Sequence, residues 1–223
     1  MNDADRNLCQ QVIDTCRKLE SLGLNQGTSG NVSVRCAAGA DAGFLLTPTS
    51  LAYDRMVPED LVHVSLEGEC TGRRRPSSEL PFHLAIMRER RDAGAVIHTH
   101  SLNATTLACL RKEIPAVHYA VGLFGGSNVR CAEYATFGTP ELSANLLRAL
   151  AGRRAALMAN HGLVVLGTDL AQALTLTEEA ETLATLYWRA LCAGEPAILT
   201  EAEMAEVRYR FGEYGYGGMG KGS

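Results

Sequence analysis

Apolar residues near the N-terminus recur at intervals of three or four positions, which is the spacing of one face of an α-helix. Gly23 directly follows this stripe and predicts the end of the helix. We therefore expect an amphipathic helix that packs its apolar face against a core. The stripe consists of Leu8, Val12, Cys16, Leu19 and Leu22.

Farther along, short apolar runs predict β-strands, and several helical segments carry start and stop signals. Asp169 caps a long helix that Gly194 ends, and Thr200 with Glu203 forms a capping box for a last helix that closes near Gly212. Further helices are expected at Pro76-Ser77-Ser78, with Pro81 in the first turn, after His100, and at Thr139-Pro140-Glu141. Strands are expected over residues 31–36, 43–47, 61–66, 95–98, 116–119, 155–159 and 163–166.

No internal repeat or linker interrupts this pattern, so residues 1–214 are expected to form one domain. Residues 215–223 are rich in glycine and are expected to form a flexible tail. Helices interspersed with a mostly antiparallel sheet predict an α/β sandwich.

Composition narrows the range of partners. Hydrophobic residues make up 46% of the chain and charged residues 21%, and the net charge is −4. This balance gives no basic field for nucleic acid, and the short run Arg73-Arg74-Arg75 is expected to be a solvated turn. No stretch approaches the ~20 apolar residues of a membrane span, so no membrane partner is expected.

The cysteines and the N-terminal segment favour a cytoplasmic location. Seven cysteines are scattered without a Cys-x-x-Cys motif, and the acidic N-terminal segment has no secretory signal pattern. In such a chain we expect reduced thiols, most of them buried.

Three histidines and a glutamate are the strongest candidates for chemistry. His98 and His100 lie two positions apart in strand-like sequence, so their imidazoles point to one side, and His161 lies in a tight turn between two strands. Together with Glu79 they suit a divalent metal of the zinc type. Each also has an ordinary alternative: the histidines as residues at a strand end or in a loop, and Glu79, which is expected in the first turn of its helix, as a glutamate stabilised by the positive end of the helix dipole. Beside a metal, Glu79 would instead serve as an acid or base.

Three groups of small and hydroxyl-bearing residues offer hydrogen-bond donors to a phosphate without any lysine. Each group alone is a common turn, and the three are informative only if the fold brings them together. They are Gly27-Thr28-Ser29-Gly30-Asn31, Thr47-Pro48-Thr49-Ser50 and Ser77-Ser78.

Several longer stretches are distinctive: Leu22-Gly23-Leu24-Asn25-Gln26-Gly27-Thr28, Gly30-Asn31-Val32-Ser33-Val34-Arg35, Pro76-Ser77-Ser78-Glu79, Ile114-Pro115-Ala116-Val117-His118-Tyr119 and Tyr134-Ala135-Thr136-Phe137-Gly138-Thr139. On these stretches, and nearly end to end, the chain resembles the class II aldolase/adducin family, and within it most closely the bacterial fuculose-phosphate aldolases. The resemblance implies a nine-stranded, mainly antiparallel sheet flanked by helices. It also implies a homotetramer of fourfold symmetry with active sites at the subunit interfaces.

The same resemblance implies roles for the four candidate residues. His98, His100 and His161 would hold Zn²⁺, for which Co²⁺ or Mn²⁺ are alternatives. Glu79 would be a further ligand that the substrate displaces and that then acts as the base. The implied reaction is reversible aldol cleavage of a ketose 1-phosphate to dihydroxyacetone phosphate and an aldehyde, with the metal stabilising an enediolate as a Lewis acid.

The resemblance further assigns the surroundings of the metal. Phe137 would line the aldehyde pocket. From residue type alone, Tyr119 and Tyr214 are packing residues with solvent-exposed hydroxyls. By the resemblance, both would instead reach the active site of a neighbouring subunit, where Tyr119 would donate a proton to the aldehyde oxygen in synthesis and remove it in cleavage. Two positions depart from the pattern, because the family often has glycine in place of Ser50 and because its C-terminal tails, near Tyr214, vary. The phosphate site would comprise Thr28, Asn31, Thr49, Ser50, Ser77 and Ser78.

Alternatives remain within the fold and outside it. A pentulose-5-phosphate 4-epimerase would place an aspartate after the second metal histidine, but residues 114–132 contain no Asp or Glu. A second alternative within the fold is a 3-oxo-tetronate-4-phosphate decarboxylase. The alternative of another class is a noncatalytic, adducin-like interaction domain, in which the metal ligands would be missing, whereas all of them are present here. The aldehyde is open among lactaldehyde (from fuculose or rhamnulose phosphate), acetaldehyde (from a 5-deoxypentulose phosphate) and methylthioacetaldehyde (from 5-methylthioribulose 1-phosphate), which differ too little for an apolar pocket to separate strongly.

Overall fold

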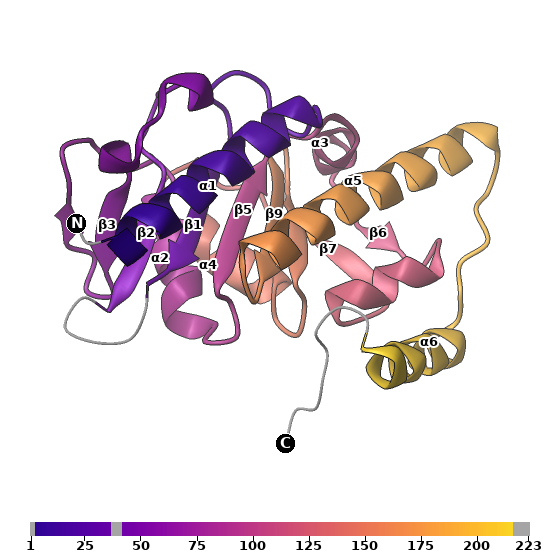
Figure 1. The fold of residues 1–223 in the computed structure, drawn as a ribbon. Coiled ribbons are helices and arrows are strands. Elements are labelled where there is room, and N and C mark those ends of the chain that lie inside the picture. The colour runs from indigo at the N-terminus through magenta and orange to yellow at the C-terminus, as the bar shows by residue number, and fades with distance from the viewer. Residues whose placement is uncertain (1–2, 37–41, 216–223) are drawn as a thin grey trace.

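A computed structural model describes residues 3–36 and 42–215, in which helices surround one nine-stranded sheet (Figure 1). Of the predicted tail, all but Gly215 lies outside the described residues. The strands are β1 (Asn31–Arg35), β2 (Gly43–Leu46), β3 (Val62–Ser65), β4 (Cys70–Thr71), β5 (Ala95–Thr99), β6 (Ile114–Pro115), β7 (Asn128–Ala132), β8 (Ala155–Met158) and β9 (Gly162–Gly167). The helices are α1 (Asp3–Ser21), α2 (Leu80–Glu89), α3 (Leu102–Cys109), α4 (Pro140–Ala149), α5 (Leu170–Ala193) and α6 (Glu201–Tyr214), with the 3₁₀ helices η1 (Tyr53–Arg55), η2 (Pro58–Asp60) and η3 (Tyr119–Phe124).

The sheet has the strand order β4-β3-β2-β1-β5-β9-β8-β7-β6, and only the pair β7–β8 is parallel. This arrangement confirms the expected nine-stranded, mainly antiparallel sheet. In its centre, Asn31 of β1 lies directly opposite His98 of β5, and His98 lies opposite Val164 of β9. The register therefore places a candidate phosphate residue beside a candidate metal ligand.

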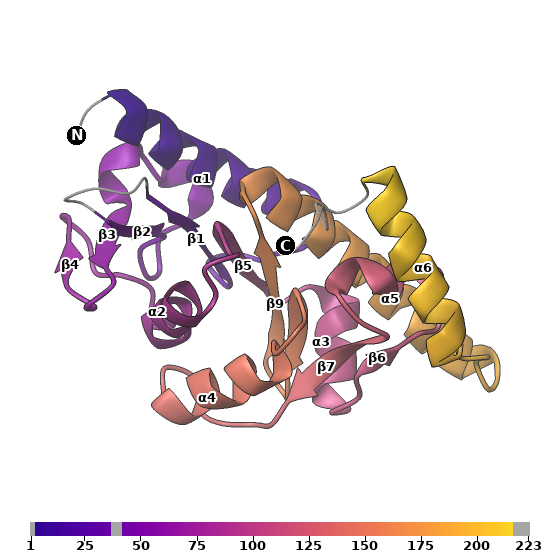
Figure 2. The same cartoon turned by 90° about the horizontal axis from the view of Figure 1, so that it is seen from below.

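Helices cover both faces of the sheet: α1 and α5 lie on one side and α2 and α4 on the other (Figure 2). On β5 the side chains alternate between the two layers, so Val96 joins the core cluster with Phe82 of α2, whereas Ile97 joins the cluster with Ile13 of α1. His98 points to the same face as Val96 and so faces α2. The candidate metal site therefore lies on the α2 side of the sheet.

The predicted helix starts and stops are confirmed where the sequence carried capping signals. The Thr139 hydroxyl accepts a hydrogen bond from the N–H of Leu142 at 3.2 Å, and the Asp169 carboxylate accepts one from the N–H of Gln172 at 2.8 Å. Helix α6 begins with the predicted capping box, and Pro81 lies in the first turn of α2. Local side-chain chemistry thus fixed these boundaries.

Two predicted segments differ in the structure. No strand forms over residues 116–119, because the N–H of Val117 turns back onto the carbonyl of Pro115 at 2.6 Å and the His118 side chain caps η3. Helix α6 continues past Gly212 and ends at Gly215, which adopts a left-handed conformation with φ +69°. Strands β4, β6 and β7 were not predicted: β4 and β6 have only two residues each, and β7 includes the polar residues Asn128 and Arg130.

The expectation of mostly buried thiols is wrong, although none of the seven cysteines forms a disulfide. Only Cys9 and Cys16, which both lie on α1 and join its core cluster, are buried. Cys70 on the edge strand β4, Cys109 at the end of α3 and Cys192 near the end of α5 are exposed. Their positions at element ends explain the exposure. Among the described helices, none combines the length and apolarity needed to cross a membrane.

The basic run is partly held by an ion pair rather than fully solvated. Arg73 and Arg74 both donate to the buried carboxylate of Asp60, at 2.8 Å each from Nη2 and Nε. Burial raises the pKa of Asp60, but the two guanidinium groups outweigh it and lower the pKa below its ordinary value. This contact anchors the segment that leads into Ser77 and Ser78.

Candidate active site

The three histidines converge because the ends of two strands meet. His98 lies in β5, His100 directly follows it, and His161 lies in the turn between β8 and β9. A Cβ atom on Gly162 would come within 2.5 Å of the Thr99 carbonyl oxygen, so only glycine lets this turn approach β5 so closely. The tight turn therefore delivers His161 to the end of β5.

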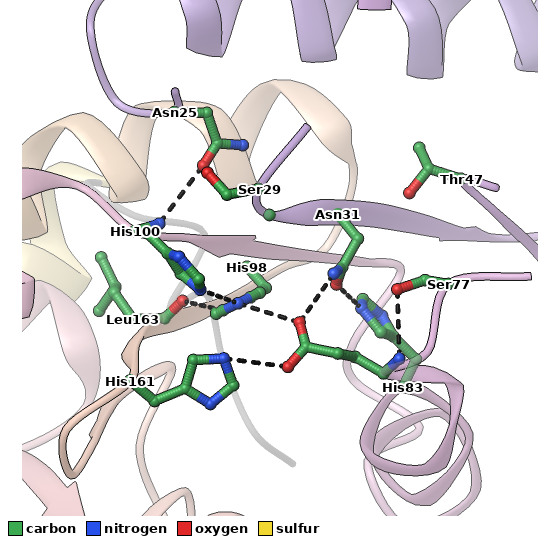
Figure 3. Close-up of polar contacts among 12 residues, drawn as sticks. Asn25, Ser29, Asn31, Thr47, Ser77, His83, His98, His100, His161 and Leu163 are labelled. Carbon is green, nitrogen blue, oxygen red and sulfur yellow. Dashed lines mark hydrogen bonds and ion pairs between the residues drawn. The ribbon is translucent and has the colours of Figure 1, made fainter. Parts of the chain in front are cut away.

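Nitrogen atoms of the three imidazoles lie within 4.8 Å of one another, and Figure 3 shows the rings around one point. The carbonyl oxygen of Leu163 can only accept, so His98 donates its Nδ1–H to it at 2.9 Å. In the tautomer with the proton on Nδ1, the lone pair is on Nε2, which lies 3.0 Å from His100 Nε2. A second hydrogen bond of this kind commonly orients a metal-binding imidazole.

The donor set fits a divalent cation. Glu79 Oε2 lies 3.0 Å from His98 Nε2, and Glu79 Oε1 lies 3.0 Å from His161 Nε2. Among the described residues, Oε1 is buried without a hydrogen bond of acceptable geometry. Nitrogen and carboxylate atoms this close together can share one cation, and three imidazoles with a carboxylate are typical zinc ligands. Such an ion would be held by His98, His100 and His161, with Glu79 beside them.

Glu79 lies at the residue before α2, not within its first turn as predicted. Its N–H donates to the Ser77 hydroxyl at 3.2 Å, and its Oε2 accepts from Nδ2 of Asn31 at 2.8 Å. Burial raises the pKa of Glu79, but the imidazoles of His98 and His161 outweigh this and hold the pKa well below its ordinary value. The carboxylate is therefore anionic and fixed toward the histidines.

A buried relay behind Glu79 was missed in the sequence. His83 is fully buried, and its Nε2 lies 2.5 Å from Asn31 Oδ1 and its Nδ1 lies 2.7 Å from the Ser33 hydroxyl. Because Asn31 donates its amide to Glu79, its oxygen accepts from His83, and the Ser33 hydroxyl donates to His83. The signal that could have revealed it is the spacing of Glu79 and His83, one helical turn apart.

The buried histidines should make the metal-free protein sensitive to acid. Burial lowers the pKa of His83 from 6.5 to about 3, and burial also lowers the pKa of His100, to about 4. Between about pH 6.5 and these values the unfolded chain binds more protons than the folded one, so stability falls as the pH falls, by up to about 1.4 kcal/mol per pH unit and group. Urea unfolding with a chelator present should show this slope, and His83→Gln should make it shallower. An unchanged slope in that variant would contradict the assignment.

All three predicted segments of small and hydroxyl-bearing residues contribute to the wall of one cavity of about 370 Å³ beside the histidines. Ser50 has φ +55°, in the left-handed region where glycine is favoured, so the backbone here has the conformation expected for a position at which glycine would be the usual residue. His98 lies fully buried behind the cavity, whereas Glu79, His100 and His161 line it. The six predicted phosphate residues among its lining are Thr28, Asn31, Thr49, Ser50, Ser77 and Ser78.

The far wall of the cavity is aromatic. Phe137 lines it as predicted, and Tyr134, which the sequence analysis did not single out, lines it too. Both rings remain more than half exposed. Asn160, the residue before His161, also lines the cavity. Its Oδ1 accepts a hydrogen bond from Nε of Arg111 at 3.0 Å.

Tyr119 and Tyr214 do not line the cavity of this single chain. Tyr119 begins η3, Tyr214 ends α6, and both side chains are exposed. The ring of Tyr119 lies 6.1 Å from that of Phe211 on α6, so η3 and α6 pack together. The two tyrosines thus belong to one corner of the molecule.

Comparison with known proteins gives consistent matches. Residues 10–188 match the profile of the Class II Aldolase and Adducin N-terminal domain. A 5-methylthioribulose-1-phosphate/5-deoxyribulose-1-phosphate aldolase of Rhodospirillum rubrum is 48% identical over 92% of this chain and 90% of its own. An L-fuculose phosphate aldolase of Escherichia coli strain K12 is 42% identical over 95% of this chain and 97% of its own.

A solved structure of an L-fuculose 1-phosphate aldolase superposes with a TM-score of 0.87 at 38% identity, covering 92% of this chain and 96% of that one. The chain therefore belongs to the class II aldolase and adducin family and is an enzyme of its aldolase, or lyase, type.

Proposed function

We propose that this enzyme is a zinc-dependent aldolase that reversibly cleaves a ketose 1-phosphate to dihydroxyacetone phosphate and an aldehyde. The observation that carries the proposal is a cavity whose wall is formed by a buried glutamate, by His100 and His161 of the histidine triad, and by three groups of phosphate-type donors. Relatives that are 40–48% identical are named as aldolases of such phosphates. Zn²⁺ is the proposed metal, with Co²⁺ or Mn²⁺ as substitutes.

The imidazoles of His98, His100 and His161 bind the metal in this proposal. Bound there, the metal supplies Lewis-acid stabilisation of the negative charge that develops on the substrate oxygens as the carbon–carbon bond breaks. Leu163 and the strand ends hold the rings in register, so the site needs little rearrangement during the reaction.

Glu79 moves the proton at carbon in the proposed mechanism. In cleavage, the bond between C3 and C4 of the ketose breaks, the C4 hydroxyl gives up its proton, and C3 gains a proton that the Glu79 carboxylate has taken up from solvent. In synthesis, the carboxylate removes that proton again. Asn31 and Ser77 hold the group by its Oε2 and its N–H, and the Asn31–His83 contact fixes its direction.

The hydroxyl groups of the cavity fix the phosphate, and with it the register of the reacting carbons. Ser77 is the sharpest test, because it is 7% exposed and lines the cavity. Ser77→Ala is expected to raise KM for the ketose 1-phosphate, and Kd for inorganic phosphate, about 10–100-fold, the loss typical of a hydrogen bond to a charged group. Ser143→Ala is the matched control, since Ser143 on α4 is also 7% exposed and lies outside the cavity. An unchanged KM in Ser77→Ala would remove Ser77 from the phosphate site.

The assembly proposed for this enzyme is a homotetramer with active sites between subunits. Tyr119 and Tyr214 are exposed on the adjoining η3 and α6, and are therefore available to a neighbouring copy. There Tyr119 would remove the hydroxyl proton at C4 during cleavage and return it during synthesis. Residues 1–214 would act as one domain with a tail at 215–223, and the enzyme would work in the cytoplasm.

The aldehyde end of the substrate meets the aromatic wall formed by Tyr134 and Phe137. This wall suits a short apolar end, such as the deoxy and methylthio ends in the names of relatives. The decisive experiment compares kcat/KM for the 1-phosphates of fuculose, rhamnulose, 5-deoxyribulose and 5-methylthioribulose with Zn²⁺, Co²⁺ and Mn²⁺. Cleavage of at least one of them is expected. Failure to cleave any would overturn the proposal and favour a decarboxylase.

A further inference from the structure

A buried polar pair lies behind the cavity and has no part in the mechanism above. Asn25 follows α1 and is 3% exposed, and Tyr53 begins η1 and is 2% exposed. Neither side chain lines the cavity. Buried polar groups are costly unless they are fully hydrogen-bonded, so a pair of this kind requires an explanation.

The pair forms a chain of hydrogen bonds with one direction. The N–H of His100 donates to Oδ1 of Asn25 at 3.3 Å, a contact visible in Figure 3. Nδ2 of Asn25 then donates to the hydroxyl oxygen of Tyr53 at 3.1 Å. Burial raises the pKa of Tyr53, so its hydroxyl keeps its proton and donates onward.

The far end of this chain is the glycine-rich loop of the cavity. The Tyr53 hydroxyl lies 3.1 Å from the carbonyl oxygens of both Ser29 and Gly30. In a trans peptide the N–H points opposite to the carbonyl, so the contact with the Ser29 carbonyl turns the N–H of Gly30 away from Tyr53, whereas Asn31 pairs with His98 in the β1–β5 ladder. Tyr53 packs in the core cluster with α1, whereas the cavity opens on the α2 side. The Gly30 N–H is thereby held on the side away from Tyr53, and both Ser29 and Gly30 line the cavity.

The Asn25 side chain also packs closely against the loop at Gly30. A Cβ atom on Gly30 would lie 2.3 Å from Asn25 Nδ2 and 2.6 Å from the His98 carbonyl oxygen. Gly30 has φ +80°, a conformation that side chains disfavour. The loop therefore cannot shift on this side without displacing Asn25, and Asn25 cannot shift without releasing the main chain of His100.

We propose that Asn25 and Tyr53 are positioning residues that hold the 28–31 loop in its anion-binding form and connect it to the metal strand at His100. The inference rests on the proposed function, because the anion is the phosphate of the substrate. The pair touches neither metal nor substrate. Its loss should therefore weaken phosphate binding while leaving metal binding and the chemical step intact.

The first test is Tyr53→Phe, which removes only the hydroxyl. Calorimetric titration of the zinc-loaded enzyme is expected to show Kd for inorganic phosphate raised about 10-fold, as for one buried hydrogen-bond group left unpaired. KM for the ketose 1-phosphate should rise in parallel, while kcat and the bound zinc per chain stay within about twofold. Tyr187→Phe is the matched control, because Tyr187 packs on α5 away from the cavity. Unchanged phosphate affinity in Tyr53→Phe would overturn the proposal.

A second test does not depend on the identity of the ligand. Amide hydrogen exchange over residues 26–31 should accelerate in Tyr53→Phe, while exchange over β5 changes less. Asn25→Ala should act through the same relay, so the double variant should bind phosphate no more weakly than the weaker single variant. Additive losses, or losses of phosphate and zinc in proportion to stability, would show a general structural role instead.

The two proposals fail in different ways. Wild-type protein that binds phosphate but cleaves no ketose 1-phosphate would defeat the proposed function, whereas the effect of Tyr53→Phe on phosphate and on loop exchange would still decide the role of the pair. An enzyme that cleaves the substrate with Tyr53→Phe showing wild-type KM and loop exchange would defeat only the relay.

Discussion

Glu79→Gln is expected to lower kcat about 10³-fold, within the range of a lost general acid or base, while the protein stays folded. Glutamine has nearly the same shape and its Oε1 can still accept from Asn31, so the buried cluster keeps its packing. It cannot carry the proton between the carbon and the solvent. The loss should therefore appear in kcat at saturating substrate and leave the bound zinc per chain unchanged.

The matched control for this change is Glu178→Gln, which makes the same substitution on an exposed position of α5. It should keep full activity. Near-wild-type kcat in Glu79→Gln, with metal and fold intact, would remove Glu79 from the proposed role. Thermal unfolding and elemental analysis of both variants separate a chemical effect from a loss of structure.

Removing the metal is expected to abolish cleavage, by at least about 10³-fold, since Lewis-acid stabilisation contributes several kcal/mol and each 1.4 kcal/mol is tenfold. Dialysis against a chelator followed by Zn²⁺, Co²⁺ or Mn²⁺ should restore the rate. Mg²⁺ should not, because it prefers oxygen ligands over imidazole. His161→Ala should lose the metal, whereas His63→Ala on β3, outside the triad, should retain it. A chelated enzyme that elemental analysis shows to be metal-free and that cleaves at full rate would contradict a metal mechanism.

Much of the fold could be predicted where local signals determine structure. The apolar stripe of α1 and the caps at Thr139 and Asp169 each depend on residues within one or two turns, and these elements formed as expected. The segment around Val117 failed because a turn onto Pro115 overrides its strand-like composition. Cysteine burial failed as well, since it depends on which face each residue meets after folding.

The candidate site was predictable where the residue types alone indicate the chemistry. Three histidines with a glutamate point to a metal in any order along the chain, and the structure brings them together. The supporting polar groups were not predictable, because His83 and Tyr53 matter through partners about 50 and 25 positions away. Nothing in their local sequence distinguishes them from core residues.

The most direct measurement of the central claim is exchange of hydrogen at carbon with solvent. Zinc-loaded enzyme is incubated with dihydroxyacetone phosphate in D₂O without any aldehyde, and NMR follows one hydrogen on the carbon that forms the new bond. The account predicts that a single hydrogen is replaced by deuterium, that chelation stops the exchange, and that Glu79→Gln slows it about 10³-fold. Folded, metal-loaded wild-type enzyme that shows no exchange would contradict the account.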